Sequence, residues 1–222
     1  MTDRRAIGVL VLVSALLMLP ALWTTPMVHD SWWIDIVWAD QFAEALRQGT
    51  LYPRWLPHSF EGLGAPVFYF YPPAVFYLVS LFGLAGLSAY PALLAAYFTI
   101  STGGAIVTWR WLKGWTRHPL AGALVALLAP YHLCDFYRRG AIAEAMAAAL
   151  LPLLAMALRR AGQLQGWGAL ALAYGVLVMT HLPLALIASL FLVAPYGLWV
   201  AWRDRAVPWG IGFGVAVGLG LS

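Results

Sequence analysis

Long apolar runs separated by short polar stretches recur along nearly the whole chain, and they constrain its fold more than any single motif. The chain is 63% hydrophobic and 10% charged over 222 residues, with a mean hydropathy of +0.79. A soluble domain carries roughly a quarter charged residues. The composition therefore predicts an integral membrane protein, an all-α polytopic transmembrane helix bundle.

The predicted spans follow the apolar runs. The first, 7–23, comes after Arg4 and Arg5 and has no small-residue cleavage site, which favours a retained span over a removed signal peptide. The last run reaches Ser222 without a polar flank, so we expect residues 1–222 to be the N-terminal portion of a longer protein. The remaining predicted spans are 90–111, 120–133, 141–158, 167–181, 184–202 and one that starts near Pro208.

The segment 67–87 is ambiguous, because it is apolar enough to span but opens among prolines and aromatic residues. Cytoplasmic loops are enriched in arginine and lysine, so the basic residues distinguish the two topologies. If 67–87 does not span and the N-terminus is cytoplasmic, the inside holds Arg4, Arg5, Arg110, Lys113, Arg117, Arg159, Arg160, Arg203 and Arg205. If it does span, the inside keeps only Arg4, Arg5, Arg138 and Arg139.

The count of basic residues favours the first arrangement. We therefore expect about seven to eight spans in an inner or plasma membrane, with residues 24–88 forming an extracytoplasmic loop. In this arrangement 67–87 lies along the outer leaflet or dips into it. Basic residues of a membrane chain mostly set orientation, so the sequence pI of 9.4 indicates no nucleic-acid partner. The single cysteine, Cys134, excludes an internal disulfide and a cysteine-based metal cluster.

The first loop holds most of the acidic residues. Five of the nine lie between residues 29 and 77: Asp30, Asp35, Asp40, Glu44 and Glu61. Residues 32–48 fit a helical period, with one apolar arc of Ile34, Trp38, Phe42, Ala45 and Leu46 and an opposite polar face of Asp40, Gln41, Glu44, Arg47 and Gln48. This pattern predicts an interfacial helix that ends at Gly49.

Two carboxylates of this loop depart from the solvated face. Asp35 falls on the apolar arc, where it is either a functional, substrate-binding carboxylate or one that snorkels to water. Asp30 precedes the helix, close to the end of the first span. There it is a candidate general base for an attacking hydroxyl, or an N-cap that Ser31 shares, and these two roles do not exclude each other.

Glycine, proline and aromatic residues fill the rest of the loop, in GTLYPRW at 49–55 and GLGAPVFYFYPP at 62–73. Aromatic clusters at an interface serve as membrane anchors and also as walls for sugars, and Tyr69 and Tyr71 are the candidate sugar contacts. Arg54 is the only cation between Arg47 and Arg110, so it is a candidate for binding either a phosphate or a lipid headgroup.

A second polar site lies at the junction of two predicted spans, in APYHLCDFYRRGAIAE at 129–144. Ionisable residues at membrane depth are costly and usually mark function. Arg138 and Arg139 are candidates to clamp a phosphate. The alternative is an internal ion-pair set of Asp135, Arg139 and Glu144. His181 ends another span on the same side, as a further candidate contact or a structural polar group; His118 and His132 we take as structural.

In this order, these motifs and the final MTHLP at 179–183 resemble a family of bacterial membrane proteins labelled pyruvoyl-tetrahydropterin-synthase-related, which are similar to GT-C glycosyltransferases. The resemblance covers about residues 1–200. It implies a sugar transferase that uses a polyprenyl-phosphate sugar on the extracytoplasmic face. Asp30 matches the first-loop acid, and Arg138, Arg139 and Glu144 match the polar junction. Asp35 stands where relatives often have histidine or another polar residue.

The expected reaction is inverting sugar transfer to a lipid, glycan or protein acceptor on the extracytoplasmic face, and membrane lipids are further expected partners. Asp30 deprotonates the acceptor hydroxyl, while Arg138, Arg139 and Arg54 hold the departing phosphate. These residues require no cofactor, although some relatives use a divalent metal. A transporter or flippase of lipid-linked sugars is the alternative, but it would need polar residues through the bilayer midplane, where this sequence is apolar. A non-catalytic assembly subunit is a third hypothesis.

Overall fold

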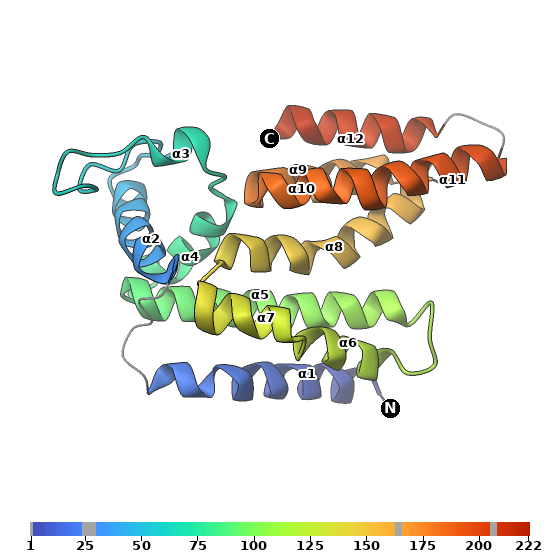
Figure 1. Ribbon diagram of the computed structural model, residues 1–222, viewed down its shortest axis with the longest axis horizontal. Coiled ribbons are helices and arrows are strands. Elements are labelled where there is room, and N and C mark those ends of the chain that lie inside the picture. Colours follow the sequence, from blue (N-terminus) through green and yellow to red (C-terminus); the bar gives the residue numbers. More distant parts are fainter. Residues whose placement is uncertain (1, 24–29, 163–165, 205–207) are drawn as a thin grey trace.

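A computed structural model shows the protein as a layered bundle of helices (Figure 1). It describes residues 2–23, 30–162, 166–204 and 208–222. Within these ranges the only β contact is an isolated antiparallel bridge between Leu56 and Ala65. The predicted all-helical class is confirmed. The first part of the predicted loop, 24–29, and Arg205 lie outside the described residues.

Five helical stretches in the described part of the chain are long and apolar enough to cross a membrane. They agree with the predicted spans to within a few residues at most ends, and 90–111, for example, is observed as α5, Ala89–Leu112. The five stretches are Asp3–Leu22 (α1, Asp3–Met18, and η1, Leu19–Leu22), Ala89–Leu112 (α5), Pro119–Arg139, Ile142–Ala161 (α8) and Leu182–Asp204.

Two further predicted spans are present as shorter helices that lie along the same bundle (Figure 1). These are α9, Trp167–Thr180, and α12, Trp209–Leu221, with 14 and 13 residues. A span needs about 20 residues, so their length alone does not reach across a bilayer. The stretch Leu182–Asp204 is made of α10 (Leu182–Ala188), one π-helical turn η3 (Ser189–Val193) and α11 (Ala194–Asp204).

The stretch Pro119–Arg139 is broken into three pieces, and its last piece carries the polar junction. Helix α6 (Pro119–Leu127) stops before Pro130, because the residue before a proline is pushed into an extended conformation, as Ala129 is here. Helix α7 (Pro130–Cys134) then continues into η2, one π-helical turn at Asp135–Arg139. Gly140 ends this turn with a left-handed φ of 66°.

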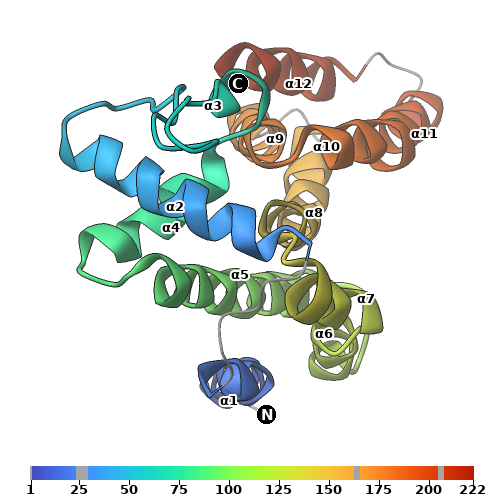
Figure 2. The ribbon, with the colours of Figure 1, turned by 60° about the vertical axis from the view of Figure 1, so that its left-hand side comes forward.

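The segment 67–87 does not form one long helix. It contains α3 (Val67–Phe70), an extended residue at Tyr71 and α4 (Ala74–Leu84), which is 11 residues long. Figures 1 and 2 show α3 and α4 at the end of the bundle where α1 finishes and α5 begins. We call this the loop end. In this structure α1 finishes and α5 begins at the same end of the bundle (Figures 1 and 2).

Helix α2 (Trp32–Arg47) lies across α4 and α5 at the loop end (Figure 2). Two of its aromatic residues, Trp32 and Phe42, are buried in one core with Phe68 of α3 and Phe76 of α4. The predicted stop at Gly49 is confirmed. The Thr50 N–H donates to the Ala45 carbonyl and the Gly49 N–H to the Leu46 carbonyl, and Gly49 has a φ of 87°.

The predicted polar face of α2 is wrong at one position. Gln41 is buried rather than solvated. Its amide donates to the Ser59 hydroxyl at 3.2 Å and its carbonyl accepts from the His58 N–H at 2.8 Å. The loop after α2 folds back over the helix and covers this side, which a pattern within the helix alone does not reveal.

The opposite end of the bundle is basic. Helices α5, α8 and α11 each carry arginines in their last turns there, and α1 begins there with Arg4 and Arg5 (Figure 1). We call this the basic end. Lys113 binds Asp3 at 3.0 Å across it, which joins the turn after α5 to the start of α1.

Candidate functional site

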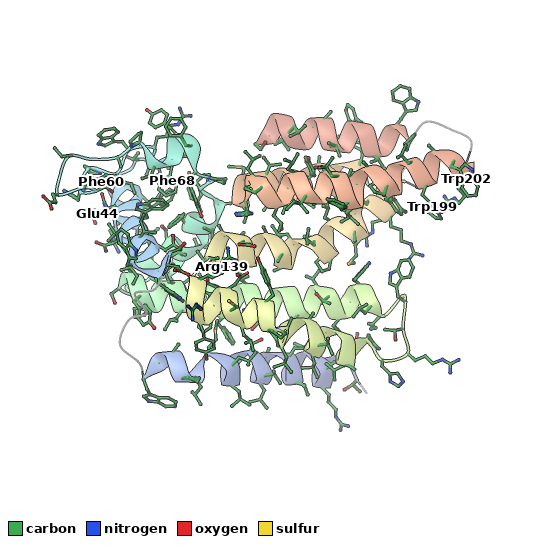
Figure 3. The ribbon with its side chains drawn as sticks, in the orientation of Figure 1. Glu44, Phe60, Phe68, Arg139, Trp199 and Trp202 are labelled. Carbon is green, nitrogen blue, oxygen red and sulfur yellow. The ribbon has the colours of Figure 1, made fainter. Side chains whose placement is uncertain are left out.

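The polar junction between η2 and α8 is a connected set of charged and hydroxyl groups. Arg139 Nη1 donates to Asp135 Oδ1 at 2.6 Å, and Arg139 Nη2 donates to Glu144 Oε2 at 2.7 Å. The Tyr131 hydroxyl donates to Glu144 Oε1 and accepts from Arg139 Nη1 at 3.0 Å. Figure 3 shows Arg139 near the start of α8, at the loop end. Asp135 and Glu144 thus bind the two terminal nitrogens of the guanidinium. This is the internal ion-pair set that was the alternative to a phosphate clamp for Arg139.

Tyr131 belongs to this cluster but was not among the predicted site residues. It precedes Asp135 by four positions, and Asp135 precedes Arg139 by four. Helical residues four apart lie on the same face, so this spacing is a signal that would have identified the tyrosine.

The start of α2 docks directly on this junction. The Ser31 N–H donates to the Arg139 carbonyl at 2.9 Å, and Trp32 Nε1 donates to the Phe136 carbonyl at 2.8 Å across 104 positions of sequence. A Cβ added to Gly140 would lie 2.6 Å from Trp32 Cδ1. The close contact, together with the left-handed φ, requires glycine at this position. These contacts bring the two predicted polar sites together.

Asp30 stands immediately before this docking point. Its side chain is exposed, and its backbone has a φ of 44°. Aspartate and asparagine adopt this left-handed conformation more readily than most residues, and such conformations cluster at functional sites. The N-cap residue of α2 is Ser31, and its side chain makes no capping hydrogen bond. The predicted role of Asp30 as the N-cap is therefore wrong, and its role as a general base stays a prediction.

Asp35 lies one turn into α2 and is 3% exposed. Among the described residues, no hydrogen bond or ion pair reaches its carboxyl group. Burial raises the pKa of Asp35 to about 8, so the group is protonated at neutral pH. The predicted snorkelling of this side chain to water is wrong. A protonated acid is a poor general base, which leaves Asp30 as the better candidate for that role.

Tyr71 and Tyr97 lie within electrostatic range of Asp35. Burial raises the pKa of the Tyr71 hydroxyl well above its usual range, and the charges of Asp35 and Glu144 raise it further. The Tyr71 hydroxyl therefore lies where the charges of both Asp35 and Glu144 act on it. Trp38 packs against the Tyr71 ring at 5.3 Å between centroids.

His181 also lies near the junction. It precedes α10, where its Nδ1 accepts a hydrogen bond from the Leu184 N–H at 3.2 Å. Burial lowers its pKa, the charge of Glu144 raises it and that of Arg139 lowers it. His181 therefore has a structural role at the start of α10. It also lies close enough to Glu144 and Arg139 for their charges to act on its ring.

The loop between α2 and α4 presents an aromatic surface. Arg54 lies over the Tyr52 ring at 4.7 Å and the Tyr69 ring at 5.5 Å. Around it is an apolar rim of four side chains, each between 73% and 86% exposed: Leu51, Phe60, Leu63 and Phe70. Figure 3 shows Phe60 at the outer edge of this loop and Phe68 facing inward. The surface therefore combines a cation with large apolar groups.

The cations at the loop end differ in their pairing. Arg47 binds Glu44 and Arg139 binds two carboxylates. Arg54 and Arg138 have no carboxylate partner among the described residues, and Arg138 is exposed. They are the two arginines of this end that are free to accept an external anion.

A cavity of about 390 Å³ extends from the junction into the bundle, between α5, α7 and α8. Near the junction its wall is polar, and deeper it is mostly apolar, although Thr108 adds a hydroxyl group there. The polar wall includes Asp135, Tyr131, Ser101 and His132, with the Ser101 hydroxyl 3.1 Å from His132 Nε2. An elongated apolar group with a polar head matches this gradient.

A divalent metal does not fit the carboxylates of the junction, since Asp135 and Glu144 are both held by Arg139. No group of three or more histidine, cysteine, aspartate or glutamate side chains is placed for a metal within the described ranges. Comparisons of the chain with protein-family models, curated proteins and solved structures found no match.

Proposed function

We propose that the protein is a membrane glycosyltransferase that transfers a sugar from a polyprenyl-phosphate donor to an acceptor hydroxyl at the loop end. The observation that carries this proposal is the docking of α2 on η2. Through the Ser31 and Trp32 hydrogen bonds, Asp30 stands beside an arginine-containing junction more than 100 positions away in sequence. An exposed acid whose neighbouring residue is hydrogen-bonded to the arginine-containing turn η2, close to residues that line an apolar cavity, suits transfer from a lipid-linked anion.

The arrangement of charge supports an extracytoplasmic loop end. Arginine and lysine gather at the basic end, at the termini of α1, α5, α8 and α11 (Figure 1). Cytoplasmic ends of membrane proteins carry this excess. We therefore place the N-terminus in the cytoplasm and the candidate site on the outer face.

In the proposed reaction, the Asp30 carboxylate accepts the proton of the acceptor hydroxyl. The acceptor oxygen then forms a bond to the anomeric carbon as the bond from that carbon to the phosphate oxygen breaks. The products are the glycosylated acceptor and polyprenyl phosphate, with inversion at the anomeric carbon. A positioned base contributes roughly 10²–10⁴ in rate to such a step.

We assign the stabilisation of the leaving phosphate to Arg138 and Arg54, since both are without carboxylate partners in the described residues. Charge develops on the phosphate as the bond breaks, and prearranged cations stabilise it. Arg139, first considered as part of this clamp, acts instead as a positioning residue. It holds Asp135 and Glu144, and its carbonyl holds the backbone beside Asp30.

The remaining features fit the same substrate. The isoprenoid chain would occupy the cavity of about 390 Å³ between α5, α7 and α8, with its phosphate toward the junction. Tyr69 and Tyr71 would flank the sugar, because aromatic rings pack against the apolar faces of sugars. The apolar rim of the loop would rest in the outer leaflet, where aromatic residues favour the headgroup region.

Lipid analysis of a strain that lacks the protein tests the proposal. We expect mass spectrometry to detect the accumulation of one polyprenyl-phosphate sugar, accessible at the outer leaflet, together with loss of that sugar from an envelope glycan, lipid or protein. A flippase would instead leave the lipid-linked sugar in the cytoplasmic leaflet. An unchanged pool of lipid-linked sugars would contradict the proposed donor.

A further inference from the structure

A separate cavity at the basic end is surrounded by arginine and tryptophan. It has a volume of about 300 Å³ and lies between the ends of α5 and α8 and the turn that follows α5. It is far from the candidate active site, which occupies the loop end (Figure 1). Its walls are Arg110, Trp111, Gly114, Trp115, Met156, Arg159 and Arg160.

The three arginines of this cavity have no carboxylate partner within the described residues. Two other cations of the basic end do have such partners: Lys113 binds Asp3 at 3.0 Å and Arg203 binds Asp204 at 2.6 Å. Three like charges around one cavity repel each other. The negative ends of the α5 and α8 dipoles offset part of this repulsion, since the arginines stand in the last turns of these helices.

The cavity also has features of a binding site rather than of a solvated surface alone. Arg159 lies over the Trp115 ring at 5.6 Å, which orients its guanidinium at the cavity wall. Arginine presents a planar fork that matches phosphate oxygens, and tryptophan favours the headgroup depth of a membrane. Both helices that form the cavity are long and apolar enough to cross a bilayer, so their ends are expected near headgroups.

We propose that this cavity binds the phosphate group of an anionic ligand, with the headgroup of an anionic phospholipid as its source. Basic pockets between transmembrane helices on the cytoplasmic side are suited to such headgroups. A soluble phosphate ester carries the same chemistry, so the two sources must be distinguished by experiment. The proposal does not depend on the glycosyltransferase activity.

The test uses the full chain, purified in an uncharged detergent and studied by native mass spectrometry. In one arm the protein is titrated with a short-chain phosphatidylglycerol and, separately, with the corresponding phosphatidylcholine. In the other arm it is titrated with glycerol 1-phosphate. Arg159→Gln and Arg110→Gln remove charges from the cavity wall, and the matched control Arg117→Gln removes an exposed charge of the same end that does not line the cavity.

We expect the wild-type protein to retain phosphatidylglycerol in preference to phosphatidylcholine. Arg159→Gln and Arg110→Gln should each weaken this binding about fivefold, the equivalent of about 1 kcal/mol per arginine near a membrane surface, and Arg117→Gln should leave it unchanged. If a glutamine variant does not fold, Arg159→Lys serves in its place. This variant keeps the positive charge but loses the planar guanidinium that can bind two phosphate oxygens at once, so weaker binding is again expected.

Binding of phosphatidylglycerol without binding of glycerol 1-phosphate would identify the lipid headgroup as the source. Arginine-dependent binding of both would support the phosphate site with a soluble ester as its ligand. Two outcomes overturn the proposal: neither compound binds in a manner that depends on Arg159 or Arg110, or Arg117→Gln weakens binding as much as the cavity variants do.

Discussion

The buried carboxyl group of Asp35 should make the stability of the protein fall as pH rises. The pKa of this group is about 8 in the folded chain, against an ordinary value of 3.8 that applies when the chain is unfolded. Between these two values the folded state holds one more proton than the unfolded state. The contribution of Asp35 to the free energy of unfolding is therefore largest below about pH 4. It is lost progressively as pH rises toward 8, because ionisation of the carboxyl group favours the unfolded state.

The size of the effect follows from this single proton. One proton of difference changes the free energy of unfolding by about 1.4 kcal/mol per pH unit, so Asp35 alone accounts for a loss of about 3 kcal/mol between pH 5 and pH 7. Asp35→Asn replaces the acid with a side chain that does not titrate. The variant should therefore lack this loss, and its stability relative to the wild type should grow by about 3 kcal/mol over the same window.

Equilibrium unfolding by SDS in mixed micelles, at pH 5, 6 and 7, measures this difference. Asp40→Asn is the matched control, since Asp40 is on the same helix but exposed. It reports any general effect of removing a charge from α2. A free-energy difference between Asp35→Asn and wild type that stays constant from pH 5 to pH 7 would refute the reasoning, because it would mean that the carboxyl group is ionised in the folded protein.

The groups that face Asp35 do not reverse this expectation. Burial raises the pKa of Tyr71, so this group is neutral in this range and makes no ion pair with Asp35. Asp135 and Glu144 are bound by Arg139, and the substitution changes none of these three residues. Their contributions therefore cancel when the variant is compared with the wild type.

The junction yields three further predictions, all measured by the same unfolding assay at pH 7. Arg139→Gln should reduce stability by about 2 kcal/mol. This is less than the 3–5 kcal/mol lost when a fully buried pair is broken, because the Arg139 side chain is 39% exposed. An unchanged unfolding midpoint would show that the ion pairs do not stabilise the fold. Gly140→Ala should lower the free energy of unfolding by about 2 kcal/mol, through backbone strain and contact with Trp32. Gly62 also has a positive φ but no atom within 4 Å of an added Cβ, so Gly62→Ala should lower it by only about 1 kcal/mol. Equal losses would mean that α2 is not docked at Gly140. Trp32→Phe should cost about 1–2 kcal/mol by leaving the Phe136 carbonyl unpaired, and no loss would show that the carbonyl finds another partner.

The helices were largely predictable because their signals are local. The apolar period located α5 to within a residue at each end, and Gly49 ended α2 where its left-handed backbone was expected. The proline pair after Tyr71 explains why 67–87 does not continue as one helix. Hydropathy and backbone preference act within a few residues, so a sequence displays them directly.

The site was only partly predictable because its contacts join distant segments. Gln41 was expected on the solvated face, but Ser59 and His58 cover it. The docking of Trp32 on Phe136 spans 104 positions, and nothing in either segment alone identifies its partner. For Arg139 the sequence left two alternatives, a phosphate clamp and ion pairs with Asp135 and Glu144. Only the structure shows that Arg139 binds these carboxylates while Arg138 does not.

The central claim is that Asp30 acts as the base of a sugar transfer. In a strain that lacks the protein, wild type and Asp40→Asn should restore the modified envelope product and clear the accumulated polyprenyl-phosphate sugar, as measured by mass spectrometry. Asp30→Asn should restore neither, although asparagine accepts the same left-handed backbone and the variant should unfold at the wild-type midpoint. Full restoration by a folded Asp30→Asn protein would contradict the account, because the base would then lie elsewhere.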